Sequence, residues 1–384
     1  MKYISNFGLF ILIITQSCSK KSDEQVFKAG QTIQIVFNEE KFPPLDSFIS
    51  DIKIVPLETN DNCLIGQQSQ QVKVHQGLIY INSFLRQLFV FDLKGNFIRE
   101  IGSRGQGPGE FYNVRDFIFT NEETIEILDF QKIECYTLEG KYVGTKRFDL
   151  NREDLKFNPM NFCKSFSAGY YFWEGMQSGR NVNFNETSHL MYRVDNNMQI
   201  ESGFFRAKFG DGGYLDRFRY YQDKILIALS SLDYNIYQID SNDNISIRYT
   251  FDFGKYGFKG KIGDDKTTIF ERYISHLSYF HETDSFLYFI FYYQNKVIYN
   301  LLYSKATDQA FIKSYAPMAN ENEIRLFPVH AIYNDQLVSV IEPFVLKSEL
   351  ERMSTENIKK WGLENLHILD DEDNPVLILY TTKF

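Results

Sequence analysis

The chain has 384 residues, of which 43% are hydrophobic and 24% are charged, and its formal net charge is −9 at pH 7. These proportions are typical of a globular protein and exclude a disordered, collagen-like or coiled-coil chain. An acidic chain without a basic block also lacks the electrostatic pattern of a nucleic-acid-binding protein, so we expect no nucleic-acid partner. Aromatic residues make up 16% of the chain. Phe and Tyr suit half-buried strands, so the composition favours an all-β fold.

The N-terminal residues have the features of a secretion signal. Lys2 precedes an apolar run over residues 7–14, which is too short to span a bilayer and fits a signal-peptide core. Cys18 follows at once and resembles the lipobox cysteine of bacterial lipoproteins, although Thr15 stands where Leu is usual. We therefore expect residues 1–18 to carry a lipoprotein signal and Cys18 to receive the lipid. The alternative is a plain secretory peptide that is cleaved nearby.

The residues after Cys18 define the predicted domain organisation. Residues 19–30 begin with a polar stretch and are predicted to be a flexible tether, and residues 31–384 are predicted to form one domain. A lipid anchor holds such a domain at a membrane without a transmembrane helix. The expected location is the cell envelope, as an outer-membrane lipoprotein that faces either the periplasm or the cell surface.

The body of the chain repeats a unit of paired apolar strands with a polar turn. The turns begin at Asp92, Thr137, Asp195, Asp240 and Ser304. Their spacing is roughly 45 to 65 residues, and a second apolar pair precedes each hairpin, which is the pattern of four-stranded propeller blades. Asp, Asn and Gly at these turns supply the local hydrogen bonds and positive φ angles that tight hairpins need.

The last unit ends one strand short. Residues 329–333, 336–341 and 375–381 supply three strands, and the chain then stops. Because an open ring would expose an unpaired strand edge, we expect the N-terminal strand over residues 52–57 to complete this blade. Six blades closed by the two termini result, with residues 32–37 predicted to pack near the closing strand. The helical pattern within residues 347–363 predicts one or two short helices inserted in the last blade.

A family resemblance agrees with this architecture. Residues 97–111 resemble an NHL-type propeller repeat, and the chain as a whole resembles the six-bladed β-propeller lipoproteins of Bacteroidota. Residues 52–58, residues 374–376 and the Cys18 signal also fit that family. Most of its members have no established activity, so the resemblance implies a fold and a location rather than a chemistry.

The glycine-rich segment over residues 102–110 is the most distinctive motif of the chain. It is not a phosphate-binding loop, since no Gly-Lys-Ser/Thr follows it and a strand, not a helix, comes next. One interpretation is a crossing between blades. The other places Arg104, Gln106 and Glu110 at one mouth of the axial channel, since loops on rigid scaffolds commonly carry function.

A second pattern concerns the innermost strand of each unit. A basic or imidazole residue lies near the start of each of these strands: Lys73, Arg115, Lys164, Arg219, His276 and His330. If alternation points them inward, the channel is basic inside an acidic protein. The alternative is that some lie between blades and pair with acids, and an error of one residue in the alignment would exchange the two faces.

Catalytic motifs are weak by comparison. No nucleophile elbow of the form Gly-x-Ser-x-Gly occurs. Six-bladed propeller lactonases and phosphotriesterases hold a central calcium through Glu, Asn and Asp, and Glu342, Asn161 and Asp116 are candidates of these types. The sequence therefore favours a binding or interaction module over an enzyme, with no cofactor expected. A calcium-dependent hydrolase or lactonase at the channel is the alternative.

The predicted binding site combines the loop and the inner strands. We expect the ligand at the channel mouth, because concave positions with convergent polar groups are the usual binding sites. Basic residues there favour a small anionic ligand, and an envelope protein is the other candidate partner. The predicted ligand-binding residues are Arg104, Gln106, Glu110, Arg115, His276 and His330.

Overall fold

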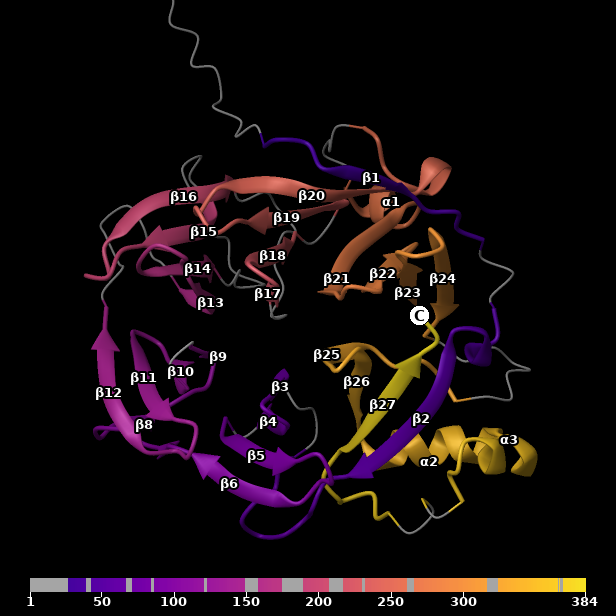
Figure 1. The fold of residues 1–384 in the computed structure, drawn as a ribbon, viewed down its shortest axis with the longest axis horizontal. Helices are drawn as coiled ribbons and strands as arrows, with labels where there is room; N and C mark the ends of the chain where they lie inside the picture. Colours follow the sequence, from indigo (N-terminus) through magenta and orange to yellow (C-terminus); the bar gives the residue numbers. More distant parts are fainter. Residues whose placement is uncertain are drawn as a thin grey trace, which may run out of the picture.

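The strands of this protein form six sheets around a central axis (Figure 1). The computed structural model describes residues 27–38, 43–66, 71–83, 86–120, 123–148, 158–174, 189–206, 217–229, 232–260, 266–315, 324–364, 366 and 369–384. The sheets follow one another around the ring in chain order. In each of them the first strand of the sequence repeat lies nearest the axis. The six-bladed β-propeller predicted from the repeats is confirmed.

The blades are numbered here in chain order, with their strands given from the axis outward. The first three are β3 (Gln71–His75), β4 (Leu78–Asn82), β5 (Leu88–Asp92) and β6 (Phe97–Ile101); β9 (Asp116–Phe119), β10 (Thr124–Leu128), β11 (Lys132–Thr137) and β12 (Tyr142–Arg147); and β13 (Pro159–Lys164), β14 (Tyr170–Glu174), β15 (His189–Val194) and β16 (Ile200–Arg206). The last three are β17 (Phe218–Tyr221), β18 (Lys224–Ala228), β19 (Asn235–Ile239) and β20 (Ile245–Asp252); β21 (Ile274–Glu282), β22 (Phe286–Tyr293), β23 (Val297–Ser304) and β24 (Gln309–Ser314); and β25 (Val329–Tyr333), β26 (Gln336–Ile341), β27 (Val376–Thr382) and β2 (Ile49–Pro56).

The outer hairpins form where the turn residues predict them. Asp92 ends β5, and its Oδ1 accepts hydrogen bonds from the backbone N–H groups of Lys94 at 2.8 Å and Asn96 at 2.9 Å. Asp240, between β19 and β20, binds the N–H of Asn244 at 3.0 Å in the same way. The aspartate side chain thereby satisfies backbone donors that the tight turn leaves without partners.

The core lies mainly between neighbouring blades. The first and second blades bury Tyr80, Val90, Phe117 and Ile125 in one apolar cluster. Burying one such side chain contributes about 1.5–3 kcal/mol, so stacked sheet faces hold the ring together. The faces of the sheets are therefore buried between neighbouring blades. The inner edges of the blades line the axis.

The two termini close the ring as predicted. β2 pairs antiparallel with β27 in the sixth blade, with Ile54 opposite Ile378. The turn of the first blade rests on the end of the closing strand, because Gly95 has a φ of +88° and a Cβ there would overlap the carbonyl oxygen of Pro56. The backbone N–H of Glu58 also donates to the carbonyl of Gly95 at 2.8 Å. The closure is thus joined to the first blade as well as to the last.

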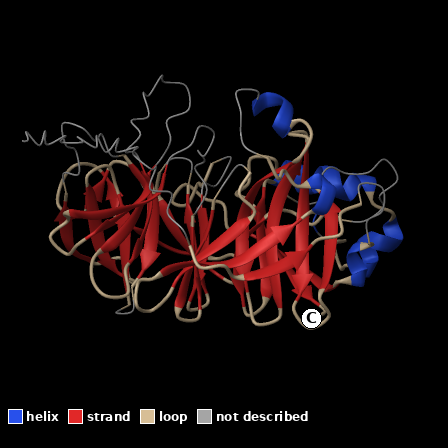
Figure 2. Ribbon diagram, turned by 90° about the horizontal axis from the view of Figure 1, so that it is seen from above, coloured by secondary structure: helices blue, strands red, loops and turns tan. Residues whose placement is uncertain are grey.

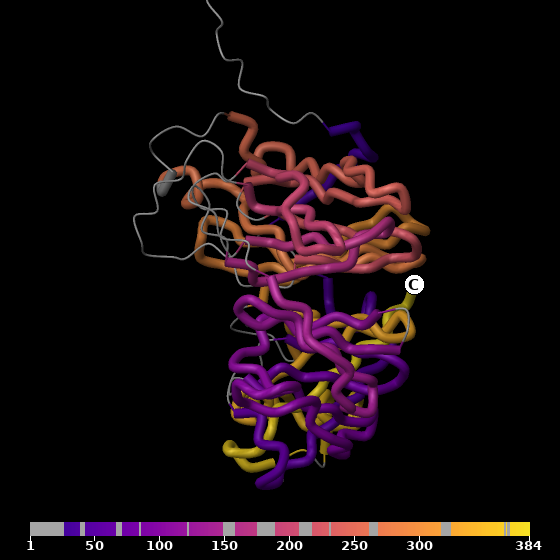
Figure 3. Tube along the Cα trace, turned by 90° about the vertical axis from the view of Figure 1, so that its left-hand side faces the viewer, coloured from indigo at the N-terminus to yellow at the C-terminus, as the bar shows by residue number. Residues whose placement is uncertain are grey.

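The segment that precedes β2 lies elsewhere than expected. The sequence placed residues 32–37 beside the closing strand, but β1 (Gln31–Gln34) pairs parallel with β20, as a fifth strand on the outer edge of the fourth blade (Figure 3). Ile33, Ile35 and Phe37 point into the apolar cluster that the fourth and fifth blades share. Phe37 meets Tyr256, Phe291, Tyr293 and Tyr299 at ring distances of 5.0–5.5 Å. This aromatic pocket decides where the segment packs.

The predicted helical insert is also confirmed. α2 (Pro343–Arg352) and α3 (Thr355–Lys360) lie between β26 and β27 in the chain, and Figure 2 shows the helices gathered at one end of the ring. Leu346 and Trp361 pack into the same cluster as Tyr380 of β27. The remaining short elements are η1 (Leu45–Ser47), η2 (Gly254–Tyr256), α1 (Lys266–Phe270) and the parallel pair β7 (Ser103–Arg104) and β8 (Glu110–Phe111). Within the described residues, no helix is long and apolar enough to cross a membrane.

Candidate functional site

All six innermost strands meet at one cavity on the propeller axis. Its volume is about 630 Å³, which lies in the range of small-molecule binding sites. It is lined towards the ends of the inner strands and at the turns that follow three of them. The lining residues are Val72, Lys73, Val74, His75, Gln76, Ile118, Phe119, Thr120, Glu123, Phe162, Phe218, Arg219, Tyr220, Gln222, His281, Glu282, His330, Ala331 and Ile332.

One part of the cavity wall is aromatic and apolar. The ring of His75 stacks on Phe119 with centroids 4.1 Å apart and an angle of 8° between the planes. Burial lowers the pKa of His75, so its ring is neutral at pH 7. Ile118 and Phe162 extend the apolar surface over the second and third blades. This part of the wall offers flat, uncharged surface to a ligand.

Another part brings basic residues together from the last three blades. Arg219 of β17 lines the cavity beside His281 of β21 and His330 of β25. Burial and the positive charge of Arg219 lower the pKa of His330 to about 4 and the pKa of His281 well below its ordinary value. The two imidazoles are therefore neutral at pH 7, and the charge of this group resides on Arg219.

The neutral histidines are fixed by backbone hydrogen bonds. The Nε2 of His281 lies 3.2 Å from the carbonyl oxygen of Val329, so this nitrogen must carry the hydrogen. The Nδ1 of His330 accepts from the backbone N–H of Val340 at 3.3 Å. Each imidazole thus has a defined orientation before any ligand arrives, which lowers the entropic cost of binding.

The other cation on the cavity wall is held by an acid. Lys73 of the first blade lies 3.0 Å from Asp116 of the second, and its ammonium also donates to the carbonyl of Phe117 at 2.6 Å. The second carboxylate oxygen of Asp116 accepts from the backbone N–H of Phe162 in the third blade at 3.0 Å. Asp116 therefore joins three consecutive blades and neutralises Lys73.

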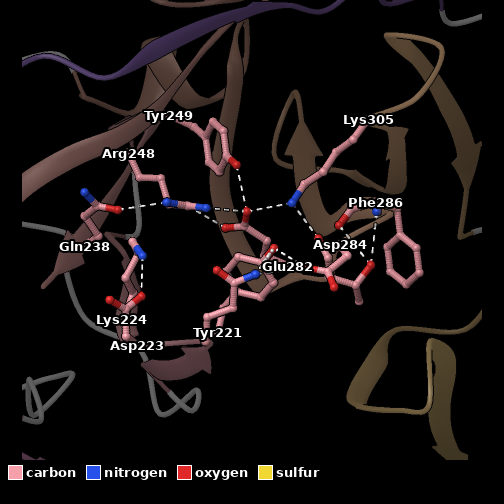
Figure 4. Close-up of polar contacts among 12 residues, drawn as sticks. Tyr221, Asp223, Lys224, Gln238, Arg248, Tyr249, Glu282, Asp284, Phe286 and Lys305 are labelled. Atoms are coloured by element: carbon pink, nitrogen blue, oxygen red, sulfur yellow. Dashed lines mark hydrogen bonds and ion pairs between the residues drawn. The ribbon is translucent and has the colours of Figure 1, made fainter. Parts of the chain in front are cut away.

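The acid on the opposite wall is enclosed by cations. Glu282, with no exposed side-chain surface, pairs with Arg248 at 2.6 Å and with Lys305 at 2.7 Å (Figure 4). The hydroxyl of Tyr249 donates to the same carboxylate at 2.7 Å. Burial alone would raise the pKa of Glu282, but these hydrogen bonds and charges outweigh it and hold the pKa below its ordinary value. Its negative charge is thus balanced before a ligand binds.

His276, a predicted site residue, is not among the residues that line the cavity. Its ring stacks on Phe270 of α1 at 5.1 Å. β21 contains two bulges, with Ser275, Ser278 and His281 opposite Tyr292, Ile290 and Tyr288. The shared face of β21 therefore repeats every three residues rather than every two, which brings His281 to the cavity.

Arg104 and Arg115 do not line the cavity; each packs over one ring of a neighbouring aromatic pair. The guanidinium of Arg104 lies 5.3 Å from the ring of Tyr112, and that of Arg115 lies 4.1 Å from the ring of Phe130. The two rings are 5.9 Å apart. Arg115 also donates to Asn158 at 2.5 Å, so it bridges the second and third blades.

The glycine-rich loop packs on the outer strands of the second blade. Figure 1 places β8 beside β12, on the outside of the ring. The Oε2 of Glu110 accepts from the N–H of Gly107 at 2.8 Å, and Lys132 of β11 donates to the Glu110 carbonyl at 2.5 Å. Gln106 is exposed. Of the six ligand-binding residues predicted from the sequence, His330 lines the cavity and the other five do not.

Only some of the basic and imidazole residues near the starts of the inner strands line the cavity. Lys73, Arg219 and His330 line the cavity. Lys164 lies between the second and third blades, 3.3 Å from the buried Glu126, which also binds Lys146 at 2.7 Å. The alternative of pairing between blades thus holds for Lys164. His75, Phe119, His281 and Glu282 are cavity residues that the sequence did not single out. The only available signal was their position near the ends of the inner strands.

The calcium candidates Asp116, Asn161 and Glu342 come from the second, third and sixth blades. Among the described residues, no three His, Cys, Asp or Glu side chains are arranged to hold a metal ion. Asp116 is occupied by Lys73 and backbone amides, and Glu342 is the N-cap residue of α2 in the sixth blade. Cys18, the predicted lipidation site, lies outside the described residues.

Residues 31–381 match the model of a family described as a domain of unknown function, DUF4934. This chain belongs to the DUF4934 family. The match spans all six blades, including β1 and the closing strand, so the propeller as a whole corresponds to the family domain. The NHL-type and lipoprotein resemblances remain predictions. No curated protein matches the chain.

A solved structure of another protein agrees with the propeller fold of this DUF4934 chain. A presumed exported protein from Bacteroides fragilis, known from a crystal structure, has a TM-score of 0.69 and 17% sequence identity, covering 93% of this chain and 100% of the other. That likeness shows the fold. The WD40 domain of Pan2 from Neurospora crassa is less similar, with a TM-score of 0.39 and 9% identity over 76% of each chain.

Proposed function

We propose that this protein is a lipid-anchored binding module of the bacterial cell envelope, with a small-molecule ligand in the central cavity. The observation that carries the proposal is the cavity of about 630 Å³, into which all six innermost strands bring side chains. Polar and apolar side chains both line this cavity, and a few convergent polar groups beside apolar surface are typical of ligand sites. The rigid ring positions these groups before binding, so little conformational entropy is lost.

The bonding within the cavity wall favours binding over catalysis. Lys73 is held by Asp116, and Glu282 is held by Arg248 and Lys305. The described residues that line the cavity include no Ser or Cys that would serve as a nucleophile. Lys73 and Glu282 already have partners, so neither is free to act as a general base next to a reacting group.

The envelope location rests on the predicted signal and on where the domain begins. Phe27 already packs against Phe205 and Tyr237 at ring distances of 5.2 Å, and the carbonyl of Lys28 accepts from the N–H of Ile247 at 2.9 Å. Phe27 and Lys28, which the sequence assigned to the tether, therefore contact the third and fourth blades. The proposed lipid on Cys18 would hold the propeller at this side of the ring.

A cavity-filling substitution tests the binding role. Val74 is half-buried and lines the cavity, so Val74→Trp places an indole where the ligand would lie. Val143→Trp is the matched control, because Val143 is 59% exposed on the outer strand β12. Small molecules extracted from envelope fractions should raise the melting temperature of the wild type and of Val143→Trp, since a ligand that binds the folded state stabilises it. Equal stabilisation of folded Val74→Trp would contradict the proposal.

A further inference from the structure

The charged side chains that line the cavity balance one another. Among the described lining residues two are cationic and two are anionic: Lys73, Arg219, Glu123 and Glu282. The three lining histidines are neutral at pH 7, because burial lowers the pKa of each. These residues thus give the cavity wall no excess charge that would select an ion of either sign.

Two exposed glutamines line the cavity from opposite blades. Gln76 lies in the turn between β3 and β4 of the first blade, and Gln222 lies in the turn between β17 and β18 of the fourth. In a ring of six, these two blades lie across the axis from one another (Figure 1). An amide both donates and accepts hydrogen bonds, as a hydroxyl group does, so the pair suits an uncharged polar ligand.

Two acceptors on the wall have a fixed orientation. The Nε2 of Gln222 donates to the hydroxyl of Tyr221 at 3.1 Å and to Asp284 at 3.0 Å, so the amide is oriented and its carbonyl oxygen can accept from a ligand. The hydrogen of the neutral His281 ring lies on Nε2, which faces the carbonyl of Val329, and Nδ1 keeps its lone pair. Both groups favour a ligand that carries hydroxyl donors.

An aromatic ring is exposed beside these polar groups. Tyr220 of β17 lines the cavity and is 53% exposed. A sugar ring has a face of C–H groups that packs against flat aromatic surface, and its hydroxyl groups project from its edge. The cavity wall thus presents both surfaces that such a ring needs.

We infer, on the basis of the proposed binding role, that the ligand is an uncharged saccharide. One face of a sugar ring packs on Tyr220, and its hydroxyl groups bind the amides of Gln76 and Gln222 and the Nδ1 of His281. A ligand without hydroxyls would take these polar groups out of water without giving them partners, which lowers its affinity.

A set of phenyl ethers of ring sugars tests this inference with the full-length chain. The neutral members are phenyl β-D-glucopyranoside, phenyl β-D-galactopyranoside and phenyl N-acetyl-β-D-glucosaminide. Phenyl β-D-glucuronide is anionic, and phenyl tetrahydropyranyl ether has the ring without hydroxyls. In ligand-detected NMR titrations, at least one neutral glycoside should bind about tenfold or more tightly than the tetrahydropyranyl ether, which corresponds to about 1.4 kcal/mol. It should also bind at least as tightly as the glucuronide.

Gln76→Gly separates binding from folding. The φ of Gln76 is +48°, which glycine adopts freely, so the variant should not lower the melting temperature. Its affinity for the best neutral glycoside should fall about threefold or more, as expected for a lost hydrogen bond. Gln294→Gly is the matched control, because Gln294 has a φ of +55° in the turn between β22 and β23 and does not line the cavity.

Tyr220→Leu tests the aromatic surface. Leucine is apolar but has no flat ring, so the affinity for the neutral glycosides should fall. Tyr112→Leu is the control, because Tyr112 is 45% exposed and lies outside the cavity. Melting curves establish that each variant is folded. If Tyr220→Leu does not fold, Gln76→Gly decides.

The outcomes separate this inference from the proposed function. If the tetrahydropyranyl ether or the glucuronide binds more tightly than every neutral glycoside, and Val74→Trp abolishes its binding, the cavity is a ligand site but the saccharide inference is wrong. Glycoside binding that Gln76→Gly and Tyr220→Leu leave unchanged also overturns the inference. If no compound binds, or binding survives in Val74→Trp, both the inference and the proposed function fail.

Discussion

Arg248 of the fourth blade holds Glu282 of the fifth in a two-bond ion pair, with Nε–Oε2 at 2.6 Å and Nη2–Oε1 at 2.7 Å. The carboxylate has no exposed surface, while Arg248 is 19% exposed. This pair couples the charge balance of the cavity wall to the packing of two blades. It also makes the wall sensitive to the loss of either partner.

Removing the cation should therefore destabilise the ring. Arg248→Met leaves Glu282 buried with one cation fewer, and loss of one partner from a buried pair typically costs about 3–5 kcal/mol. Lys305 and Tyr249 remain as partners, so we expect a loss near the lower end of that range. Denaturant unfolding monitored by tryptophan fluorescence measures it.

A surface pair provides the control for that experiment. Lys259 is 67% exposed and lies 3.1 Å from Asp252. Lys259→Met should change the free energy of unfolding by less than about 1 kcal/mol, because exposed pairs contribute little. Equal effects of Arg248→Met and Lys259→Met would show that the buried pair has no special role.

The closure of the ring predicts a specific effect at Gly95. Gly95 and Gly254 both have positive φ angles, but a Cβ at Gly254 meets nothing within 4 Å, whereas one at Gly95 overlaps Pro56. Gly254→Ala should cost about 1–2 kcal/mol from backbone strain alone. Gly95→Ala should cost clearly more in thermal or chemical unfolding. If the two losses are equal, the turn of the first blade does not rest on the closing strand.

The pKa of His330 predicts a stability that depends on pH. Its folded value of about 4 lies below the ordinary 6.5, so the unfolded chain binds the proton more readily between these values. The contribution of His330 to stability is fully present above pH 6.5 and decreases as the pH falls towards 4, by about 3 kcal/mol in total. His330→Gln should therefore lose less stability than the wild type between pH 7 and pH 5.

The comparison with the variant is needed because another group acts in the opposite direction. Burial raises the pKa of Glu174 to about 7, so its contribution to stability decreases as the pH rises from 4.5 to 7. Subtracting the two unfolding curves removes this shared contribution. Parallel curves for the wild type and His330→Gln would mean that His330 is not buried in the neutral form.

The predicted lipid on Cys18 determines where the protein should be found in the cell. If Cys18 is lipidated, the protein should be found in the membrane fraction, and Cys18→Ala should move it to the soluble envelope fraction, because a single anchor supplies the attachment. Unchanged fractionation of Cys18→Ala would show that Cys18 carries no lipid. The propeller itself should melt at the same temperature in both forms.

The architecture was predictable because its signals are local and repeated. Asp92 and Asp240 mark hairpins through their own side-chain hydrogen bonds, and the chain that ends one strand short requires a partner such as β2. The packing of β1 was not predictable in this way. Its apolar residues indicate a buried face, but the aromatic pocket around Phe37 that receives them comes from distant parts of the chain.

The candidate site was less predictable than the fold. Alternation along β21 cannot locate His281, because two bulges with positive φ at His276 and Tyr279 change the period of the strand. Neither residue is a glycine, so the sequence does not indicate the two bulges. Arg104 was assigned to the channel because its loop is rich in glycine, but a loop between blades can fold inward or outward. Contacts with Lys132 and Tyr136 of β11 hold the loop outside.

The central claim is that the ligand lies on the propeller axis, and a crystal structure with a bound ligand tests it most directly. Crystals soaked with the tightest-binding glycoside or with a ligand recovered from envelope extracts should show it in the cavity of about 630 Å³. We expect it to contact residues that line the cavity on several blades, such as Phe119 of β9 and His330 of β25. A ligand bound on the surface at Arg104 and Tyr112, with the cavity empty, would contradict the account.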